Sequence, residues 1–149
     1  MSPREMLLTR IAECLQRIRV ADGYLTDAGL TVTREPAPVI GEAEAAFIAV
    51  VWDKQDRAVD PARSNTSRLT TVQVLAKVPA TLANAQAKLD ALTTDIEEAM
   101  ADQAFRYPVG FQFPQYQSAQ PLAPQQVGQA WIGVAITYTS HIPIRRRAA

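Results

Sequence analysis

The side chains that most often carry out catalysis are few in this sequence and far apart. His141 is the only histidine and Cys14 the only cysteine, and together they cannot complete a tetrahedral zinc site without several carboxylates. Glu97 and Glu98 are neighbours on an expected helix, so their carboxylates point in different directions rather than toward one substrate atom. We therefore expect no catalytic residue, and no enzyme.

Binding motifs for metals and cofactors are also missing. Asp53, Asp56 and Asp60 are spaced closely enough to suggest a cation site, but the glycine and terminal glutamate of a calcium loop are absent. The sequence contains no CxxC, HExxH, GxSxG, GxGxxG or GxxxxGK[ST] pattern. The expectation is a protein without metal or cofactor.

Length and charge favour one ordinary domain. The chain has 149 residues, 48% of them hydrophobic, and 15 basic residues balance 15 acidic ones. This size predicts a single domain over residues 1–149, and the neutral charge directs the protein toward no particular class of partner. Neither a signal peptide nor a stretch of about 20 apolar residues is present, so we expect synthesis in the cytoplasm and no membrane contact.

The start of the chain encodes a helix. Ser2 and Glu5 form a capping box around Pro3, and apolar residues then recur every three or four positions as far as Ile18. Cys14 belongs to this apolar stripe, so we expect a buried thiol. The arginines between the apolar positions are expected to be solvated, and Asp22-Gly23 is expected to end the helix.

The remaining periodicities predict a two-layer α+β domain. Strands are expected at 30–34, 45–52, 67–78 and 130–142, and a second helix at about 81–103. Because segment 45–52 is apolar on both faces, we expect a central strand there, paired antiparallel with 67–78. The expected fold is a mostly antiparallel sheet of about four strands with two helices packed on one face.

Three segments fall outside this pattern. Residues 53–66 are rich in charge and are expected to form a mobile hairpin loop. Residues 105–128 combine prolines, glutamines and aromatics, and predict an ordered excursion with an edge hairpin. Residues 145–149 form a basic tail, in which Arg145, Arg146 and Arg147 could contact phosphates or simply increase solubility.

Apolar residues in strand 45–52 and in the excursion exceed what two helices on one sheet face should need to cover. This excess suggests self-association, although the same side chains could instead complete the core of a monomer. The candidate residues for contact with another subunit, or with a tube of other subunits, are Phe47, Val51, Trp52, Asp56, Arg57, Arg63, Phe111, Phe113 and Tyr116.

A helix followed by Gly23-Tyr24-Leu25-Thr26-Asp27-Ala28-Gly29 resembles the tail terminator, or tail completion, proteins of long-tailed bacteriophages. In that family a similar Gly-Tyr-x-Thr-x-x-Gly segment follows the first helix. The order of the later elements is similar too, including the helix that carries Asp95-Ile96 and the closing strand 133–138. Segment 105–128 matches no part of the family pattern.

The resemblance implies a virion structural protein without catalytic activity. Such a protein forms a ring, usually a hexamer, that caps the head-proximal end of the tail tube, ends tube polymerisation and offers a surface for head joining. Its implied partners are other copies of itself, the tail tube protein, the head-tail connector or neck proteins, and genomic DNA passing through the channel. By analogy, Arg145, Arg146 and Arg147 would face that DNA.

Two other functions remain open from the sequence. One is another ring protein of the same neck region, either a head-tail connector or a head-closure component. The other, from a different class, is a small adaptor or nucleic-acid-binding module that uses the basic face of the first helix and the arginine tail.

Overall fold

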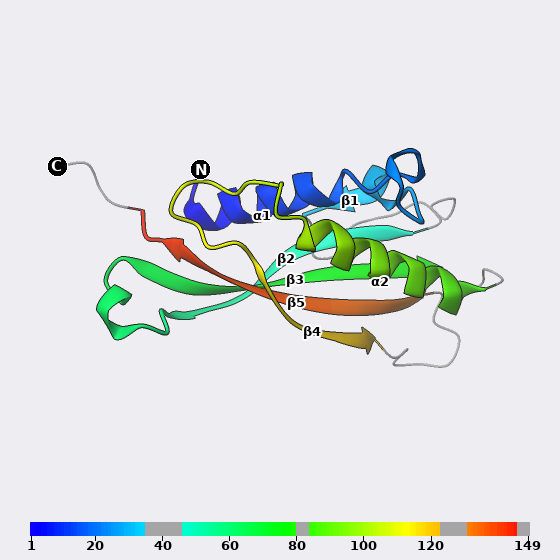
Figure 1. The fold of residues 1–149 in the computed structure, drawn as a ribbon. Coiled ribbons are helices and arrows are strands. Elements are labelled where there is room, and N and C mark those ends of the chain that lie inside the picture. Colours follow the sequence, from blue (N-terminus) through cyan, green and yellow to red (C-terminus); the bar gives the residue numbers. More distant parts are fainter. Residues whose placement is uncertain (35–45, 80–83, 123–130, 146–149) are drawn as a thin grey trace.

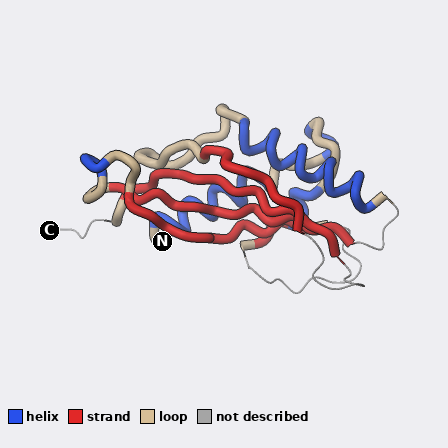
Figure 2. Tube along the Cα trace, turned by 90° about the horizontal axis from the view of Figure 1, so that it is seen from below, coloured by secondary structure: helices blue, strands red, loops and turns tan. Residues whose placement is uncertain are grey.

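The computed structural model describes residues 1–34, 46–79, 84–122 and 131–145. It has two layers, a five-stranded sheet and two helices, α1 and α2, that lie side by side over one face of that sheet (Figure 1). Seen from below in Figure 2, the strands lie in front of α1. The α+β class is confirmed, with five strands where the sequence predicted about four.

Helix α1 spans Pro3–Leu15 and begins as the sequence predicted. The Ser2 Oγ accepts a hydrogen bond from the Glu5 amide at 3.2 Å, and the Ser2 amide donates to Glu5 Oε2 at 3.4 Å. The end of the helix was predicted wrongly, because it falls at Leu15 rather than at Asp22-Gly23. The chain then forms two 3₁₀ turns, Val20–Asp22 and Ala28–Thr31.

Five strands form the sheet in the order β1-β2-β3-β5-β4, and only the β1–β2 pair is parallel. Their bounds are β1 Val32–Thr33, β2 Phe47–Arg57, β3 Ser67–Pro79, β4 Gln115–Leu122 and β5 Trp131–Pro143. Strand β3 is therefore the central strand. The expectation that segment 45–52 is central was wrong, because only the two-residue β1 lies beyond β2.

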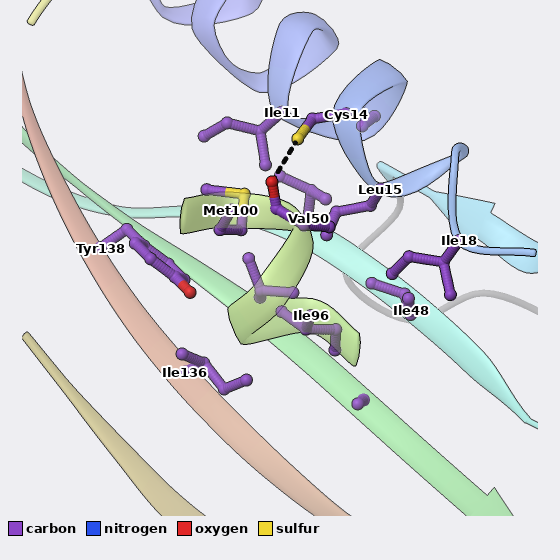
Figure 3. Packing of buried hydrophobic residues seen from close by; sticks show 14 of the residues in the cluster. Ile11, Cys14, Leu15, Ile18, Ile48, Val50, Ile96, Met100, Ile136 and Tyr138 are labelled. Atoms are coloured by element: carbon purple, nitrogen blue, oxygen red, sulfur yellow. Dashed lines mark hydrogen bonds between the residues drawn. The ribbon is translucent and has the colours of Figure 1, made fainter. Parts of the chain in front are cut away.

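The core lies between the sheet and the helices. Alternate residues of β3 face the helices and are buried, and α2, which spans Ala85–Ala101, covers them with its apolar stripe. Figure 3 shows the side chains of both helices meeting those of the strands there. The thiol of Cys14 is buried at 1% exposure and donates to the carbonyl of Ala99 at 3.3 Å, which confirms its place in the core.

Strand β2 continues beyond its expected end and contains a bulge. Trp52 lies opposite Val72, but Lys54 lies opposite Thr71, so one extra residue, Asp53, is accommodated between them. The pairing then continues to Arg57, which lies opposite Arg68. The prediction of a loop over 53–66 is therefore wrong for residues 53–57, which belong to β2.

The excursion after α2 returns to the sheet as an edge strand. Tyr107 packs edge-to-face against both Phe105 and Phe113, with ring centroids 5.5 Å apart in each pair. The chain then enters β4, which pairs antiparallel with β5 and is the strand the sequence did not count. Residues 123–128 of the predicted excursion lie outside the described residues, as do Arg146 and Arg147 of the tail.

Candidate assembly surface

The segment that follows α1, residues 16–31, is here called the connector. Its centre is fixed to α2 by Asp95, whose side chain is completely buried. Asp95 Oδ1 accepts from the Leu25 amide at 2.9 Å, while Oδ2 accepts from the Thr26 amide at 2.8 Å and the Thr26 hydroxyl at 2.7 Å. A buried carboxylate is tolerated when donors surround it in this way. Asp95 therefore belongs to the buried face of α2, although its side chain is charged.

Two glycines complete the shape of the connector. Gly23 adopts φ +94°, a left-handed conformation that favours glycine, and follows the first 3₁₀ turn. Gly29 is required for space instead, because a Cβ there would lie 2.4 Å from the carbonyl oxygen of Gln16. The Gly-Tyr-x-Thr-x-x-Gly pattern therefore has a physical basis, in which the glycines permit the turns and Thr26 binds the helix.

Three aliphatic side chains of the connector point outward. Val20, Leu25 and Leu30 are 54%, 63% and 63% exposed, and all three line one groove of about 360 Å³. Lys88 and Leu92 of α2 form part of its wall. Single exposed aliphatic residues are common, but three around one groove make an apolar patch that the sequence patterns did not indicate.

Two arginines that were expected to be solvated, Arg10 of α1 and Arg17 of the connector, instead contact the excursion. Arg10 and Arg17 lie over the ring of Phe105, at 4.1 and 4.6 Å from its centroid. Arg17 also pairs with Asp102 at 2.9 Å, and its hydrogen bond lowers the pKa of that carboxyl. Burial raises the pKa of the adjacent Cys14 thiol, although the hydrogen bond from Arg17 opposes this shift. The cluster is structural, since it joins α1 to the excursion.

The β2–β3 hairpin extends past the helices, with its tip at the left in Figure 1. The tip contains a short 3₁₀ turn, Pro61–Arg63, which Asp60 caps by accepting from the Ala62 amide at 3.0 Å. His141 of β5 joins the tip to the excursion. Its Nε2 accepts from the Val59 amide at 3.3 Å, and its Nδ1 lies 2.9 Å from Gln112 Oε1. The His141 amide donates to that same amide oxygen at 2.9 Å.

The predicted contact residues of β2 do not form one patch. Phe47 is only 7% exposed and packs edge-to-face against Trp131, with centroids 5.5 Å apart. Val51 is half-buried, and its pairing with Gln73 places it on the sheet face away from the helices. Trp52 is 50% exposed on the helix side, where the guanidinium of Arg4 lies 5.3 Å from its ring centroid.

The other predicted contact residues are spread over the hairpin and the excursion. Asp56 pairs with Lys54 at 3.4 Å, while Arg57 and Arg63 are exposed. Phe111 and Phe113 are half-buried within the subunit, and Tyr116 is 51% exposed on the edge strand β4. Arg145 is exposed where the described chain ends. Part of the apolar surplus inferred from the sequence is therefore packed inside the subunit.

No group of three or more histidine, cysteine, aspartate or glutamate side chains among the described residues could hold a metal ion. Neither of the two described helices combines the length and the apolar character that a membrane crossing requires.

Comparison with known proteins identifies the fold. No family model and no curated protein sequence matches the chain. Among solved structures, a chain described as the virion of a native gene transfer agent particle matches with a TM-score of 0.62 and 13% identity, over 92% of this chain and 94% of the other. A second chain, whose description names no function, matches with a TM-score of 0.50 and 15% identity over 94% and 96%.

The two helices on one face of a five-stranded sheet are thus a fold that a gene transfer agent virion also contains, matched along nearly the whole of both chains. At 13% identity the likeness concerns the fold alone.

Proposed function

We propose that this protein is a structural component of a phage-like particle, and specifically a tail terminator. In this role, copies form a ring, hexameric by resemblance, that caps the head-proximal end of the tail tube, stops its polymerisation and presents a surface for head joining. The observation that carries the proposal is the end-to-end fold match with a chain of a gene transfer agent virion. The resemblance of Gly23–Gly29 to the tail terminator family supports the more specific assignment.

A closed ring of identical subunits needs two different patches on each copy, one for each neighbour. The connector groove, with Val20, Leu25 and Leu30 exposed around it, supplies one apolar patch. Tyr116 on the edge strand β4 and Trp52 on β2 are further exposed apolar residues on other parts of the subunit. This distribution suits a subunit with neighbours on more than one side.

The hairpin tip is the proposed contact with the tail tube. It projects beyond the helix layer (Figure 1), and its residues are mostly exposed, including Val59 at 75%. The 3₁₀ turn and the His141 contact hold it in a defined shape, so it is presented to a partner as an ordered element.

The proposal is tested by shortening the tip without cutting the paired strands. Removing residues 60–64 deletes the 3₁₀ turn but keeps β2 to Arg57 and β3 from Ser67. Light scattering and negative-stain imaging should show that the variant assembles as the wild type does. When the variant is mixed with tube protein, we expect the tail tubes to stay uncapped and to grow beyond their normal length. A variant that still yields tails of normal length would contradict the proposed tube contact.

The same imaging separates this function from its alternatives. Wild-type protein bound to the ends of tubes that lack heads supports a terminator rather than a head-closure component. Salt-dependent DNA binding by a monomer that forms no ring at any concentration would instead identify a nucleic-acid-binding module.

A further inference from the structure

The bulge at Asp53 sorts the charges of the β2–β3 hairpin onto its two faces. Before the bulge, Trp52 shares the helix side of the sheet with its partner Val72, which is buried under the helices. After the bulge, Gln55 and Arg57 face the helix side. Their partners on β3, Thr70 and Arg68, lie on the same face of that strand as Val72. Lys54 and Asp56 therefore face the other side, where they pair with each other at 3.4 Å.

Three arginines gather on the helix side of the hairpin as a result. Arg57 and Arg68 stand directly opposite each other on neighbouring strands, and Arg4 reaches over from α1 to donate to Gln55 Oε1 at 3.2 Å. We call Arg4, Arg57 and Arg68 the arginine face. Arg68 also lies opposite Ile142 of β5, which is buried in the core, so this side of the sheet is well defined.

Among the described residues, the arginine face has no carboxylate partner. Within the described part of the chain the ion pairs are Arg10–Glu13, Arg17–Asp102 and Lys54–Asp56, and none includes these three arginines. Three carboxylates close to these arginines along the chain have other partners: Glu5 accepts from the Ser2 amide, Asp56 pairs with Lys54, and Asp60 accepts from the Ala62 amide. Like charges placed directly across a strand pair repel each other, and an anion bound between them would relieve the repulsion.

The C-terminal tail leaves the sheet at the same end. The amide of Ile144 donates to the carbonyl of Thr66 at 3.1 Å, which places Arg145 beside the start of β3. In the sequence, Arg146 and Arg147 follow. Guanidinium groups bind phosphate through paired hydrogen bonds, and DNA-binding surfaces are more polar and more basic than protein interfaces.

We infer that the arginine face binds the phosphate backbone of duplex DNA, with Arg145 adding to the same basic surface. The inference rests on the proposed function, because the resemblance to tail terminators implies that genomic DNA passes through the centre of the ring. It extends that function by assigning DNA contact to the side of the hairpin that carries Arg57 and Arg68. Because phosphates are contacted and no base-reading element is involved, the binding does not depend on DNA sequence.

The test is the salt dependence of binding to a fluorescently labelled duplex of mixed sequence, followed by anisotropy. Arg57→Gln removes one guanidinium from the arginine face. Lys54→Gln is the matched control, since it removes the same charge from the same strand on the opposite side. A combined Arg145→Gln, Arg146→Gln and Arg147→Gln variant isolates the tail.

For Arg57→Gln we expect affinity to fall roughly five- to tenfold at about 0.1 M salt, and the slope of log K against log salt to decrease by about 0.9. Lys54→Gln should stay within about twofold of wild type, because a charge on the far side contributes only weakly through the screened field. The effect of Arg57→Gln should persist in the variant that lacks the tail arginines.

Equal weakening by Arg57→Gln and Lys54→Gln would overturn the inference, because net charge alone would then explain binding. Absence of binding by the wild type at low salt would overturn it as well. Competition by polyglutamate as strong as by unlabelled duplex would point to an acidic protein partner and would also contradict it. Light scattering on the same samples reports ring formation separately, so failure of the DNA contact and failure of the ring are distinguished.

Discussion

The roles of single residues in this protein follow from where each polar group finds its partners. Asp95 has no exposed surface and sits among Leu25 and Thr26, so its three hydrogen bonds replace the water that it loses. These bonds tie the connector to α2 at the motif that resembles the tail terminator family. Folding, rather than contact with a partner, therefore accounts for Thr26 of the motif and for Asp95 of α2.

Replacing Asp95 with asparagine tests this role. The amide group would substitute a donor for one oxygen and would leave donors of Leu25 or Thr26 without an acceptor. We expect a loss of about 3 kcal/mol in the free energy of unfolding, measured by urea denaturation. Glu98→Gln on the exposed face of α2 removes the same charge and should change the unfolding free energy by less than about 0.5 kcal/mol. Equal effects of the two variants would contradict this account.

At the scale of elements, the sequence predicted regular segments well and connections poorly. The capping box at Ser2 and the alternation in β3 are local signals, and both were confirmed. The helix end at Leu15 was missed because apolar spacing continues through Ile18, which is buried although it lies outside the helix. The second half of β2 was not recognised as a strand because its residues are mostly charged. Both faces of a projecting hairpin can be polar, so the apolar alternation of a strand is absent there. Asp95 and Gln112 were missed because their partners are distant in sequence.

The hairpin tip provides a test at this scale. His141 accepts from the Val59 amide, and its other ring nitrogen contacts Gln112, so one imidazole links two connections. In His141→Ala we expect the Val59 amide to exchange with solvent at least about tenfold faster, because it loses its acceptor. The amides of Val72 and Val74 in β3 serve as internal controls and should keep their protection. Unchanged exchange at Val59 would show that the tip is held by other contacts.

For the whole molecule, the two-layer fold explains most of the burial but leaves several apolar side chains outside. Phe47, Phe111 and Phe113, which the sequence suggested for contact between subunits, are largely packed within the subunit. Val20, Leu25 and Leu30, which it did not suggest, remain exposed around the connector groove. Sequence patterns indicate how much apolar area exists, but the tertiary fold decides which part of it stays uncovered.

Self-association into a ring has a thermodynamic consequence that needs no variant. Subunit binding stabilises the folded state by mass action, so the thermal midpoint should rise with protein concentration. For a six-membered ring we expect about 1 kcal/mol per subunit for each tenfold increase, or roughly 3 °C for a domain of this size. Scanning calorimetry over a hundredfold range of concentration measures the shift. A midpoint independent of concentration would indicate a subunit that does not assemble alone.

The single extra residue in β2 bears on how related chains can be compared. The face that a residue occupies follows from its partner on β3, so the residue numbers that face the helices change from even before Asp53 to odd after it. Loss of Asp53 alone would restore a regular ladder and would leave Gln55 and Arg57 on the helix side. In an alignment of such proteins, a one-residue gap at this position would therefore leave the charge pattern of the two hairpin faces unchanged.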